Sequence, residues 1–273
     1  MKTQLEKSQA FAALHRRGHC FVIPNPWDAG TAKMFQHLGF QALASTSAGF
    51  AFSQAKTDET IAAQDMLPHL ADLAAATDLP VSADLQSGFG DSPDDAARTI
   101  VESAATGIVG CSIEDATDDP AAPVYDIGLA TERIRAAAEA ARSLPFKFML
   151  TARAENFRLG RPDLADTIRR LQAFQEAGAD VLFAPGLRAI EDIAAVVRAV
   201  DLPVNVMMGL HGPTPTVAEL AAAGVARVSL GASLARTAYG AALRAAQEVL
   251  EGGTFGYTEG TLQAADLNRI FTS

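Results

Sequence analysis

Cysteine, lysine, histidine and long apolar runs are all scarce in this sequence of 273 residues. The two cysteines, Cys20 and Cys111, stand in short apolar runs, which indicates buried thiols and excludes a disulfide framework. No apolar run approaches the roughly 18–20 residues that a membrane span requires. Residues 1–19 carry charges throughout and lack the apolar core of a signal peptide. We therefore expect a cytoplasmic protein.

Positive charge is in deficit as well. The chain has 22 lysines and arginines against 32 aspartates and glutamates, which gives a formal net charge of −10. Nucleic-acid binding needs clustered cations that replace counterions on phosphate, and docking on anionic membranes needs the same sign of charge. We therefore expect neither nucleic acid nor membrane among the partners.

Short apolar runs alternate with longer amphipathic segments along most of the chain. The apolar runs are four to eight residues long and almost continuously apolar, as is typical of strands buried on both faces. These runs are Cys20–Pro24, Ala42–Thr46, Pro80–Asp84, Ile108–Glu114, Phe146–Ala152, Val181–Ala184, Pro203–Met207 and Val225–Gly231. The predicted helices are Ala29–Leu38, Ala62–Ala76, Pro93–Ala105, Ala130–Ser143, Pro162–Ala177, Ala189–Ala199 and Thr216–Ala223.

This alternation predicts an α/β fold, a (β/α)8 TIM barrel with a parallel sheet. A doubly wound sheet is the alternative, but it usually has fewer strands and less even spacing. An extra N-terminal helix is expected from about Thr3 to Arg17, and a last helix from about Ser233 to Leu250. We expect one domain over residues 1–273, with its core at about 20–250 and a C-terminal tail at 252–273 that includes a short helix at Ala264–Phe271.

Acidic side chains stand where several predicted strands end. Active sites of such barrels lie at the C-terminal ends of the strands, where Asp84 and Glu114 would meet Arg153. Carboxylates that crowd together need a counter-charge, and with Asp58 from a nearby loop they predict a bound cation. Oxygen ligands without histidine favour Mg²⁺ or Mn²⁺ over zinc. The alternative is that these acids only cap helices or pair with Arg153.

The missing residues also narrow the chemistry. No lysine ends a predicted strand, because Lys147 precedes the apolar part of its own strand, and a Schiff-base mechanism is therefore disfavoured. Four of the five histidines fall in the first 69 residues, away from the predicted strand ends. His211, in the loop after the seventh strand, is the exception, and a role as a proton donor is weighed there against an ordinary loop position.

Six phrases of the sequence resemble the isocitrate lyase/phosphoenolpyruvate mutase superfamily over about residues 20–250. They are NPWDAGTA at 25–32, STSAGFAFS at 45–53, ADLQSGFGD at 83–91, SIEDAT at 112–117, TARAE at 151–155 and GRPDL at 160–164. The resemblance implies a barrel whose last helix is exchanged with a neighbouring subunit, in a homodimer or homotetramer. It also implies a Mg²⁺ ion and a small 2-oxo acid as the ligand.

The resemblance assigns roles to particular residues. Asp84 matches the principal metal ligand, while Glu114 and Asp58 match acids that bind the metal through water. Arg153 matches the arginine that contacts the 2-oxo acid. It also implies that Thr46, Ser47 and Ala48 bind substrate, because they occupy the loop that cradles the carboxylate. Asn205, at the end of the seventh predicted strand, is a further candidate for substrate binding from its position alone.

Two departures from the superfamily pattern matter. Gln86 stands where a second acid of the metal site is usual, so it could act only through a metal-bound water and metal binding is expected to be weaker. The lyase branch carries a K-K-C-G phrase with an acid/base cysteine, whereas the loop at 116–126 contains neither cysteine nor lysine. The usual cleavage of isocitrate or methylisocitrate is therefore disfavoured, and so is phosphonopyruvate chemistry, because the basic loop of the mutase branch is not evident.

The favoured hypothesis is a Mg²⁺-dependent lyase or decarboxylase that acts on a small 2-oxo dicarboxylate such as oxaloacetate through a metal-stabilised pyruvate enolate. Arg153, Asp58 and Glu114 are the expected catalytic residues, and water or Tyr125 would protonate the enolate. One alternative keeps the site but changes the bond, giving a mutase or hydrolase for phosphonopyruvate or phosphoenolpyruvate. The other is a non-catalytic protein that binds 2-oxo acids.

Overall fold

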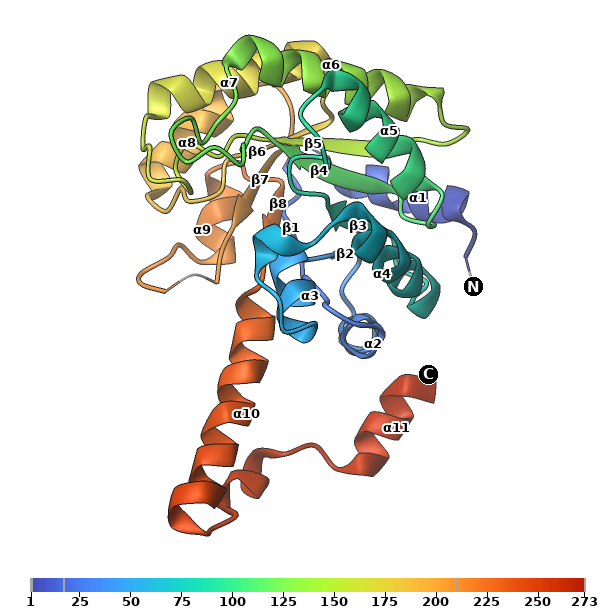
Figure 1. Cartoon of the computed structure of the whole chain (residues 1–273), viewed down its shortest axis with the longest axis vertical. Helices are drawn as coiled ribbons and strands as arrows, with labels where there is room; N and C mark the ends of the chain where they lie inside the picture. Colours follow the sequence, from blue (N-terminus) through green and yellow to red (C-terminus); the bar gives the residue numbers. More distant parts are fainter. Residues whose placement is uncertain (1, 17, 210, 273) are drawn as a thin grey trace.

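Eight short parallel strands form one sheet in a computed structural model of the chain, which describes residues 2–16, 18–209 and 211–272 (Figure 1). Each strand lies inside or overlaps an apolar run predicted from the sequence. The strands are β1 (Phe21–Ile23), β2 (Leu43–Ala44), β3 (Val81–Asp84), β4 (Gly110–Glu114), β5 (Met149–Arg153), β6 (Val181–Phe183), β7 (Val204–Met207) and β8 (Arg227–Ser229).

The order of the strands shows that the sheet closes on itself. Neighbouring strands pair in the order β1-β8-β7-β6-β5-β4-β3-β2, all in parallel. The remaining gap between β1 and β2 is bridged by a hydrogen bond, at 3.0 Å, from the Ala44 N–H to the Pro24 carbonyl. The predicted (β/α)8 barrel is therefore confirmed.

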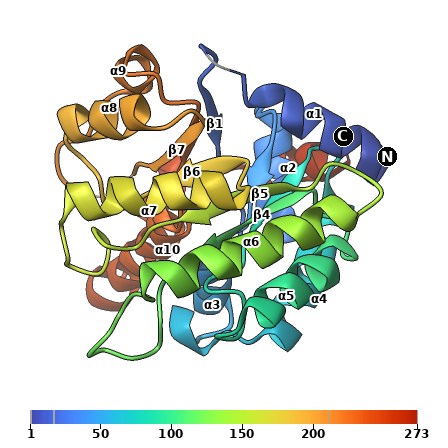
Figure 2. The same ribbon diagram turned by 90° about the horizontal axis from the view of Figure 1, so that it is seen from above.

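Most of the described helices pack around the barrel, as Figure 2 shows from above. The helices are α1 (Gln4–Leu14), α2 (Ala29–His37), α3 (Ser47–Ser53), α4 (Ala63–Ala76), α5 (Pro93–Ala104), α6 (Ile127–Ser143), α7 (Leu164–Ala177), α8 (Ile190–Ala199), α9 (Val217–Ala222), α10 (Ser233–Gly252) and α11 (Ala264–Thr272), with two short 3₁₀ turns, η1 (Asp58–Thr60) and η2 (Gly256–Gly260). Local sequence sets their ends: Ser92 caps α5 ahead of Pro93, and Gly178 ends α7 in the left-handed conformation, which costs glycine little.

Two details of the helices differ from the sequence prediction. Helix α1 ends at Leu14, short of the predicted end at Arg17, which lies outside the described residues. Helix α3 was expected to be a loop, but the hydroxyl of Thr46 accepts a hydrogen bond from the Gly49 N–H and starts a helix there. Its seven residues are too few to show helical periodicity, which explains the miss.

An apolar cluster fills part of the barrel interior at its N-terminal end. Phe11 of α1 packs there with six residues of five strands and their flanks: Phe21, Ile23, Ala42, Val109, Met149 and Val181. Helix α1 therefore covers the N-terminal mouth of the barrel and leaves the opposite mouth available for a site.

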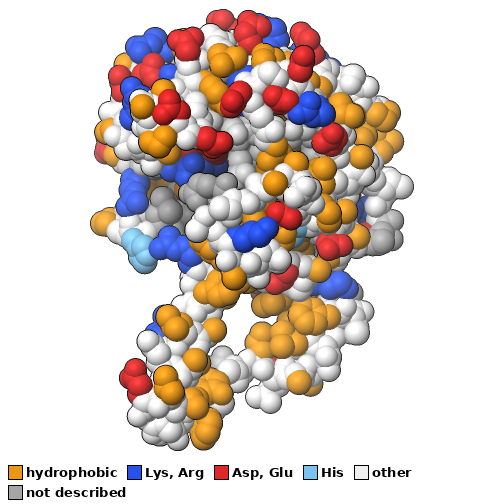
Figure 3. Space-filling model, viewed as in Figure 1, with side chains coloured by type: hydrophobic (Ala, Val, Ile, Leu, Met, Phe, Trp, Pro, Cys, Tyr) orange, Lys and Arg blue, Asp and Glu red, His pale blue; other side chains and the backbone are white. Residues whose placement is uncertain are grey.

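The C-terminal arm projects away from the barrel (Figure 1). Ala235 is the single buried residue described in α10, whereas Leu243 is 62% and Leu250 85% exposed. The chain then returns to the barrel, where α11 packs against α2 and the Lys33 Nζ donates to the Phe271 carbonyl at 2.8 Å. Figure 3 shows hydrophobic side chains exposed along this arm. No described helix, α10 included, combines the length and apolar character needed to cross a membrane.

Candidate functional site

Two neighbouring cavities lie in the barrel at the C-terminal ends of the strands. An outer cavity of about 170 Å³ is lined by residues that follow several strands: Ser47, Asp58, Gln86, Ser87, Glu114, Ala116, Thr117, Asp118, Arg153, Arg158 and Leu159. An inner cavity of about 60 Å³ lies inside the barrel, and its polar lining includes Asn25, Asp84, Ser112, Arg153, Asn205 and Arg227. Arg153 lines both cavities and therefore stands between them.

Arg153 is the centre of an ion-pair cluster. Its guanidinium lies 2.9 Å from Glu114 Oε2 and 3.3 Å from Asp84 Oδ1, and it also donates to Glu155. The pairing of β4 with β5 explains part of this geometry, because Glu114 stands directly opposite Arg153 in the register. Arg153 is only 9% exposed; burial lowers its pKa, but the three carboxylates outweigh burial and raise it above the usual value. Arg153 itself therefore stays protonated at the mouth of the barrel.

Asp84 is held by the element that follows β2. The backbone N–H and the hydroxyl of Ser47, in the first turn of α3, donate to its Oδ2 at 3.2 and 2.8 Å. The hydroxyl of Thr46 caps the same helix, and Ala48 follows Ser47 within it. The structure thus brings these residues to the site as supports of Asp84. Their predicted contact with a substrate carboxylate stays a prediction.

Asp58 and Gln86 are joined by hydrogen bonds. The side-chain amide of Gln86 donates to the Asp58 carbonyl at 2.8 Å and to its carboxylate at 3.2 Å. Gln86 holds this position with a left-handed φ of 51°. Burial, and then the charge of Asp84, raise the pKa of Asp58 above its ordinary value. The side-chain amide of Gln86 therefore connects the turn that contains Asp58 to the residues that follow β3.

Glu114 is almost completely buried beside Arg153. Burial raises the pKa of its carboxyl, the charge of Arg153 opposes the shift, and Glu155 and Asp84 add to it. A further cation near this group would stabilise its ionised form. The positive charge around Glu114 is therefore too small to offset the effect of burial on its pKa.

The charge balance of the site is suited to a divalent cation. Asp58, Asp84, Glu114 and Glu155, in their ionised forms, outnumber Arg153 and Arg158 by two negative charges. Asp118 adds one more acid to the lining of the outer cavity, and Arg227 adds one cation to the lining of the inner cavity, so the excess of two is unchanged. Within residues 2–16, 18–209 and 211–272, no three His, Cys, Asp or Glu side chains lie together as a complete set of metal ligands. Mg²⁺ keeps several water ligands and needs only one or two carboxylates, so the donors present fit that ion.

Arg158 belongs to this cluster, although the sequence analysis did not single it out. Its guanidinium pairs with Glu155 and lies 3.6 Å from Glu114 Oε1. The spacing of three residues between Glu155 and Arg158, in a turn that directly follows β5, is the signal that could have indicated it. The two arginines together enclose Glu155, which is fully buried.

The two proposed proton donors lie away from the cavities. Tyr125 is buried, its hydroxyl donates to Asp91 at 2.5 Å, and the Arg133 guanidinium lies over its ring. His211 is exposed, with its Nε2 3.1 Å from Arg236. Neither residue lines the inner or the outer cavity. Asn205, in contrast, is buried and lines the inner cavity, and its predicted contact with substrate stays a prediction.

The loop at 116–126 folds over one side of the outer cavity. A bridge pairs Ala116 with Val124, and the Thr117 N–H donates to the Pro123 carbonyl at 3.0 Å. Thr117 and Asp118 face the cavity from this loop. Cys111 is fully buried on β4, and neither Cys111 nor Cys20 is among the residues that line the two cavities.

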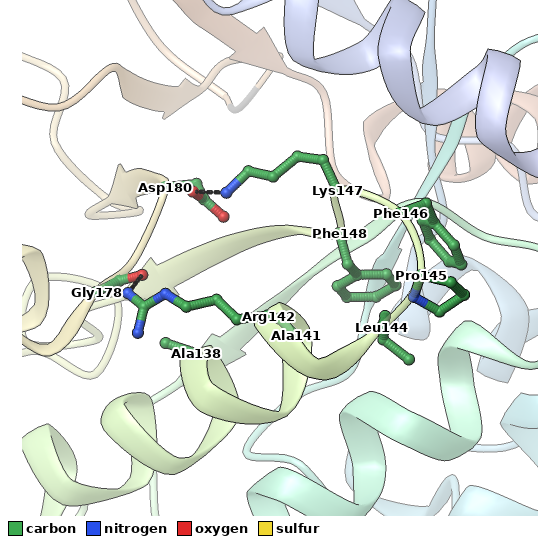
Figure 4. Close-up of a pocket in the computed structure, with 10 residues that line it drawn as sticks. All are labelled: Ala138, Ala141, Arg142, Leu144, Pro145, Phe146, Lys147, Phe148, Gly178 and Asp180. Carbon is green, nitrogen blue, oxygen red and sulfur yellow. Dashed lines mark hydrogen bonds and ion pairs between the residues drawn. The ribbon is translucent and has the colours of Figure 1, made fainter.

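A larger cavity, of about 380 Å³, lies elsewhere, between the C-terminal end of α6 and the starts of β5 and β6 (Figure 4). Figure 4 shows Lys147 paired with Asp180 and Arg142 directed at the Gly178 carbonyl. None of the predicted site residues lines this cavity. The largest of these three cavities therefore lies at the opposite end of the barrel from Arg153.

Comparison with known proteins decides the family. The sequence model described as phosphoenolpyruvate phosphomutase matches residues 11–250. The chain belongs to this family. An uncharacterized protein of Mycobacterium tuberculosis is 32% identical over 244 residues, with 89% of this chain and 90% of that protein covered. An oxaloacetate decarboxylase of Marinomonas is 24% identical over 270 residues, covering 96% of this chain and 90% of that enzyme.

Solved structures agree with the family assignment. A crystal structure from Burkholderia cenocepacia, assigned only provisionally as a lyase/mutase, is 55% identical with a TM-score of 0.97. The match covers 99% of this chain and 97% of that one, so the arm formed by α10 and α11 is part of the shared structure. The family thus contains lyases and mutases built on this barrel.

Proposed function

We propose that the protein is a Mg²⁺-dependent carbon–carbon lyase that decarboxylates a small 2-oxo dicarboxylate, with oxaloacetate as the substrate to test first. The observation that carries the proposal is the position of Arg153 between the two cavities, surrounded by carboxylates in excess. Such a site stabilises an oxyanion and needs no protein nucleophile. The similarity to an oxaloacetate decarboxylase over nearly the whole chain also supports it.

In this proposal, each residue of the site has its own role in the reaction. Arg153 donates hydrogen bonds to the 2-oxo group, and its charge offsets the electron pair that moves to that oxygen as the C3–C4 bond breaks. Glu114 and Glu155 fix the guanidinium from two sides, while Ser47 fixes Asp84. Because these groups are oriented before substrate arrives, little reorganisation is required during the reaction.

Asp84 would hold Mg²⁺ directly, with Asp58, Gln86 and Glu114 acting through water. When bound, the ion supplies Lewis-acid polarisation of the substrate oxygens. Asp58 and Glu114 orient water at the mouth, and one such water is our choice of proton donor because Tyr125 is engaged with Asp91. The loop at 116–126 excludes bulk solvent from the outer cavity once substrate is bound.

We further propose that α10 packs against a second copy of the chain, in a homodimer or a tetramer of dimers. A helix of 20 residues with one buried side chain leaves a large apolar face exposed to water, which is unfavourable in a lone subunit. Tyr239 and Leu243, spaced four residues apart on this helix, form part of that face. Exchange of this helix between subunits would cover it.

A panel of substrates tests the reaction. Metal-loaded protein should release pyruvate from oxaloacetate faster than Mg²⁺ alone. Release of phosphate from phosphonopyruvate without decarboxylation would assign C–P chemistry instead. Binding of oxaloacetate or pyruvate by calorimetry, with no turnover of any compound, would identify a 2-oxo acid binding protein and overturn the proposal.

A further inference from the structure

The floor of the inner cavity contains a buried cation that the proposed function does not use. Arg227, on β8, is 5% exposed and lines the same cavity as Asp84 and Arg153. The interior of such barrels is usually filled by branched apolar side chains, whereas Ser112 and Asn205 also face this cavity. Polar side chains therefore extend from the site down into the barrel.

All the partners of Arg227 are neutral. Its Nε donates to Asn205 Oδ1 at 2.9 Å, and one terminal nitrogen donates to Thr151 Oγ1 at 2.9 Å. The other terminal nitrogen lies 3.2 Å from His15 Nε2. Among the ion pairs of the described residues none involves Arg227. Burial lowers its pKa to about 9, so the guanidinium stays charged at neutral pH.

His15 holds Arg227 without adding charge. The His15 Nδ1 lies 2.9 Å from the Phe11 carbonyl, which can only accept, so Nδ1 carries the proton and Nε2 accepts from Arg227. Burial, and then the charge of Arg227, lower the pKa of His15 to about 3. The helix that covers the barrel floor therefore fixes this arginine from below.

Arg227 in turn determines which atoms of Asn205 face the cavity. Because Asn205 Oδ1 accepts from Arg227, its Nδ2 is the atom left to donate, and it does so to Ser229 Oγ at 3.0 Å. The second hydrogen of that amide remains for a ligand oxygen in the cavity. Arg227 and Asn205 thus provide hydrogen-bond donors and a positive charge at the floor of the site, and neither of them provides a free acceptor there.

Arg227 lies close to Arg153, where the substrate is proposed to react, because both line the inner cavity. Thr151, which accepts from Arg227, precedes Arg153 by two residues on β5, which is a rise of roughly 7 Å along the strand. Inside a protein, where the effective dielectric constant is low, a charge at this separation still acts on a developing oxyanion. The charge of Arg153 is offset by three carboxylates, whereas that of Arg227 is not.

We infer that Arg227 is a positioning residue of the proposed reaction: it orients Asn205 toward the substrate and supplies, from the barrel floor, an uncompensated positive charge that favours the enolate. The inference rests on the proposed function. It also gives a reason for a buried arginine without an ion-pair partner, since burying an unpaired charge is otherwise costly.

Substitutions of Arg227 separate the effect of its charge from the effect of its hydrogen bonds. Arg227→Met removes the charge and keeps the length, Arg227→Lys keeps the charge, and Arg227→Gln is a neutral variant that can still hydrogen-bond. We expect Arg227→Met and Arg227→Gln, compared as folded proteins, to lower kcat on oxaloacetate by about 10- to 100-fold with KM little changed, as for supporting residues around other reactive sites. Arg227→Lys should recover most of that loss, and Arg198→Met, at an exposed arginine on α8, should match the wild type.

Binding of oxalate, a planar dianion similar in shape to the enolate of pyruvate, gives a second readout. In the presence of Mg²⁺, the fluorescence of Trp27, the one tryptophan of the chain, should report oxalate affinity that falls about tenfold in Arg227→Gln but not in Arg227→Lys. Equal kcat and equal oxalate affinity in folded Arg227→Gln and wild type would overturn the inference. Equal losses in the lysine and glutamine variants would overturn it as well.

The two proposals fail in different ways. If the wild type does not turn over oxaloacetate, the proposed function fails, and the oxalate comparison still decides whether Arg227 favours an enolate-like anion. If the wild type is active and Arg227→Gln is equally active, only the role of Arg227 is wrong. Should Arg227→Met fail to fold, the lysine and glutamine variants carry the same comparison.

Discussion

At the scale of single residues, the protein places buried charges in two contrasting settings. Arg153 is surrounded by carboxylates, and Arg227 by neutral donors and acceptors. The first setting suits a group that must stay fixed while a ligand and a cation come and go. The second leaves a positive charge free to act on an anion in the cavity. Each setting leads to a different expectation for stability.

His15 should make stability depend on pH. Its folded-state pKa is about 3, below the usual value near 6.5, so the unfolded chain binds a proton that the folded chain does not. The free energy of unfolding should therefore fall as the pH drops from 6.5, by at most about 2 kcal/mol at pH 5 from this group. Urea unfolding of the wild type and His15→Gln at pH 7 and 5 measures this.

His15→Gln should lose less stability between the two pH values than the wild type does. His37→Gln, at an exposed histidine of α2, is the matched control and should behave as the wild type. The same fall in both variants would contradict the expectation.

Elements of the barrel are packed so closely at some points that a single methyl group cannot be added. A Cβ at Gly110, on β4, would lie 2.7 Å from the Met149 carbonyl and 3.1 Å from the ring of Phe11. The neighbouring strand β5 would have to move, because the carbonyl belongs to its backbone. We expect Gly110→Ala to lower the free energy of unfolding by about 1–3 kcal/mol in urea titrations. Gly260→Ala, where nothing lies within 4 Å, should change it far less.

The exposed face of α10 leads to a prediction about assembly. Leu243→Glu puts a charge on a helix face that we propose is covered by a second copy, so the oligomer should dissociate. Light scattering after size-exclusion chromatography measures the mass, and Arg244→Gln, at the next residue, is the control that removes no apolar surface. A wild-type monomer, or an unchanged oligomer in Leu243→Glu, would show that this face has another role.

Sequence patterns predicted the elements because each strand carries its own signal. Short, almost continuously apolar runs located all eight strands, and the acids at the ends of β3 and β4 did come together around Arg153. The pattern failed for α3, which is too short to show a period. The helix α10 was located, but its exposed face depends on what covers it, which a single sequence does not encode locally.

At the scale of the whole molecule, the site depends on contacts between distant parts of the chain. Arg227 was missed because an arginine at the start of a strand ordinarily points to solvent. Its burial follows from β8 lying between β1 and β7 and from α1 covering the floor. Likewise Arg158 acquires its role only when the turn after β5 folds over Glu114. Such relationships follow from barrel closure and not from local sequence.

The most direct test of the account is the rate at which purified protein with Mg²⁺ forms pyruvate from oxaloacetate, compared between the wild type and Asp84→Asn. Asp84 joins Ser47, Arg153 and the expected metal, so loss of its charge should lower the rate by about 100-fold or more, while Arg198→Met should remain fully active. A wild-type rate no higher than that of Mg²⁺ alone, or an Asp84→Asn variant as active as the wild type, would contradict the central claim.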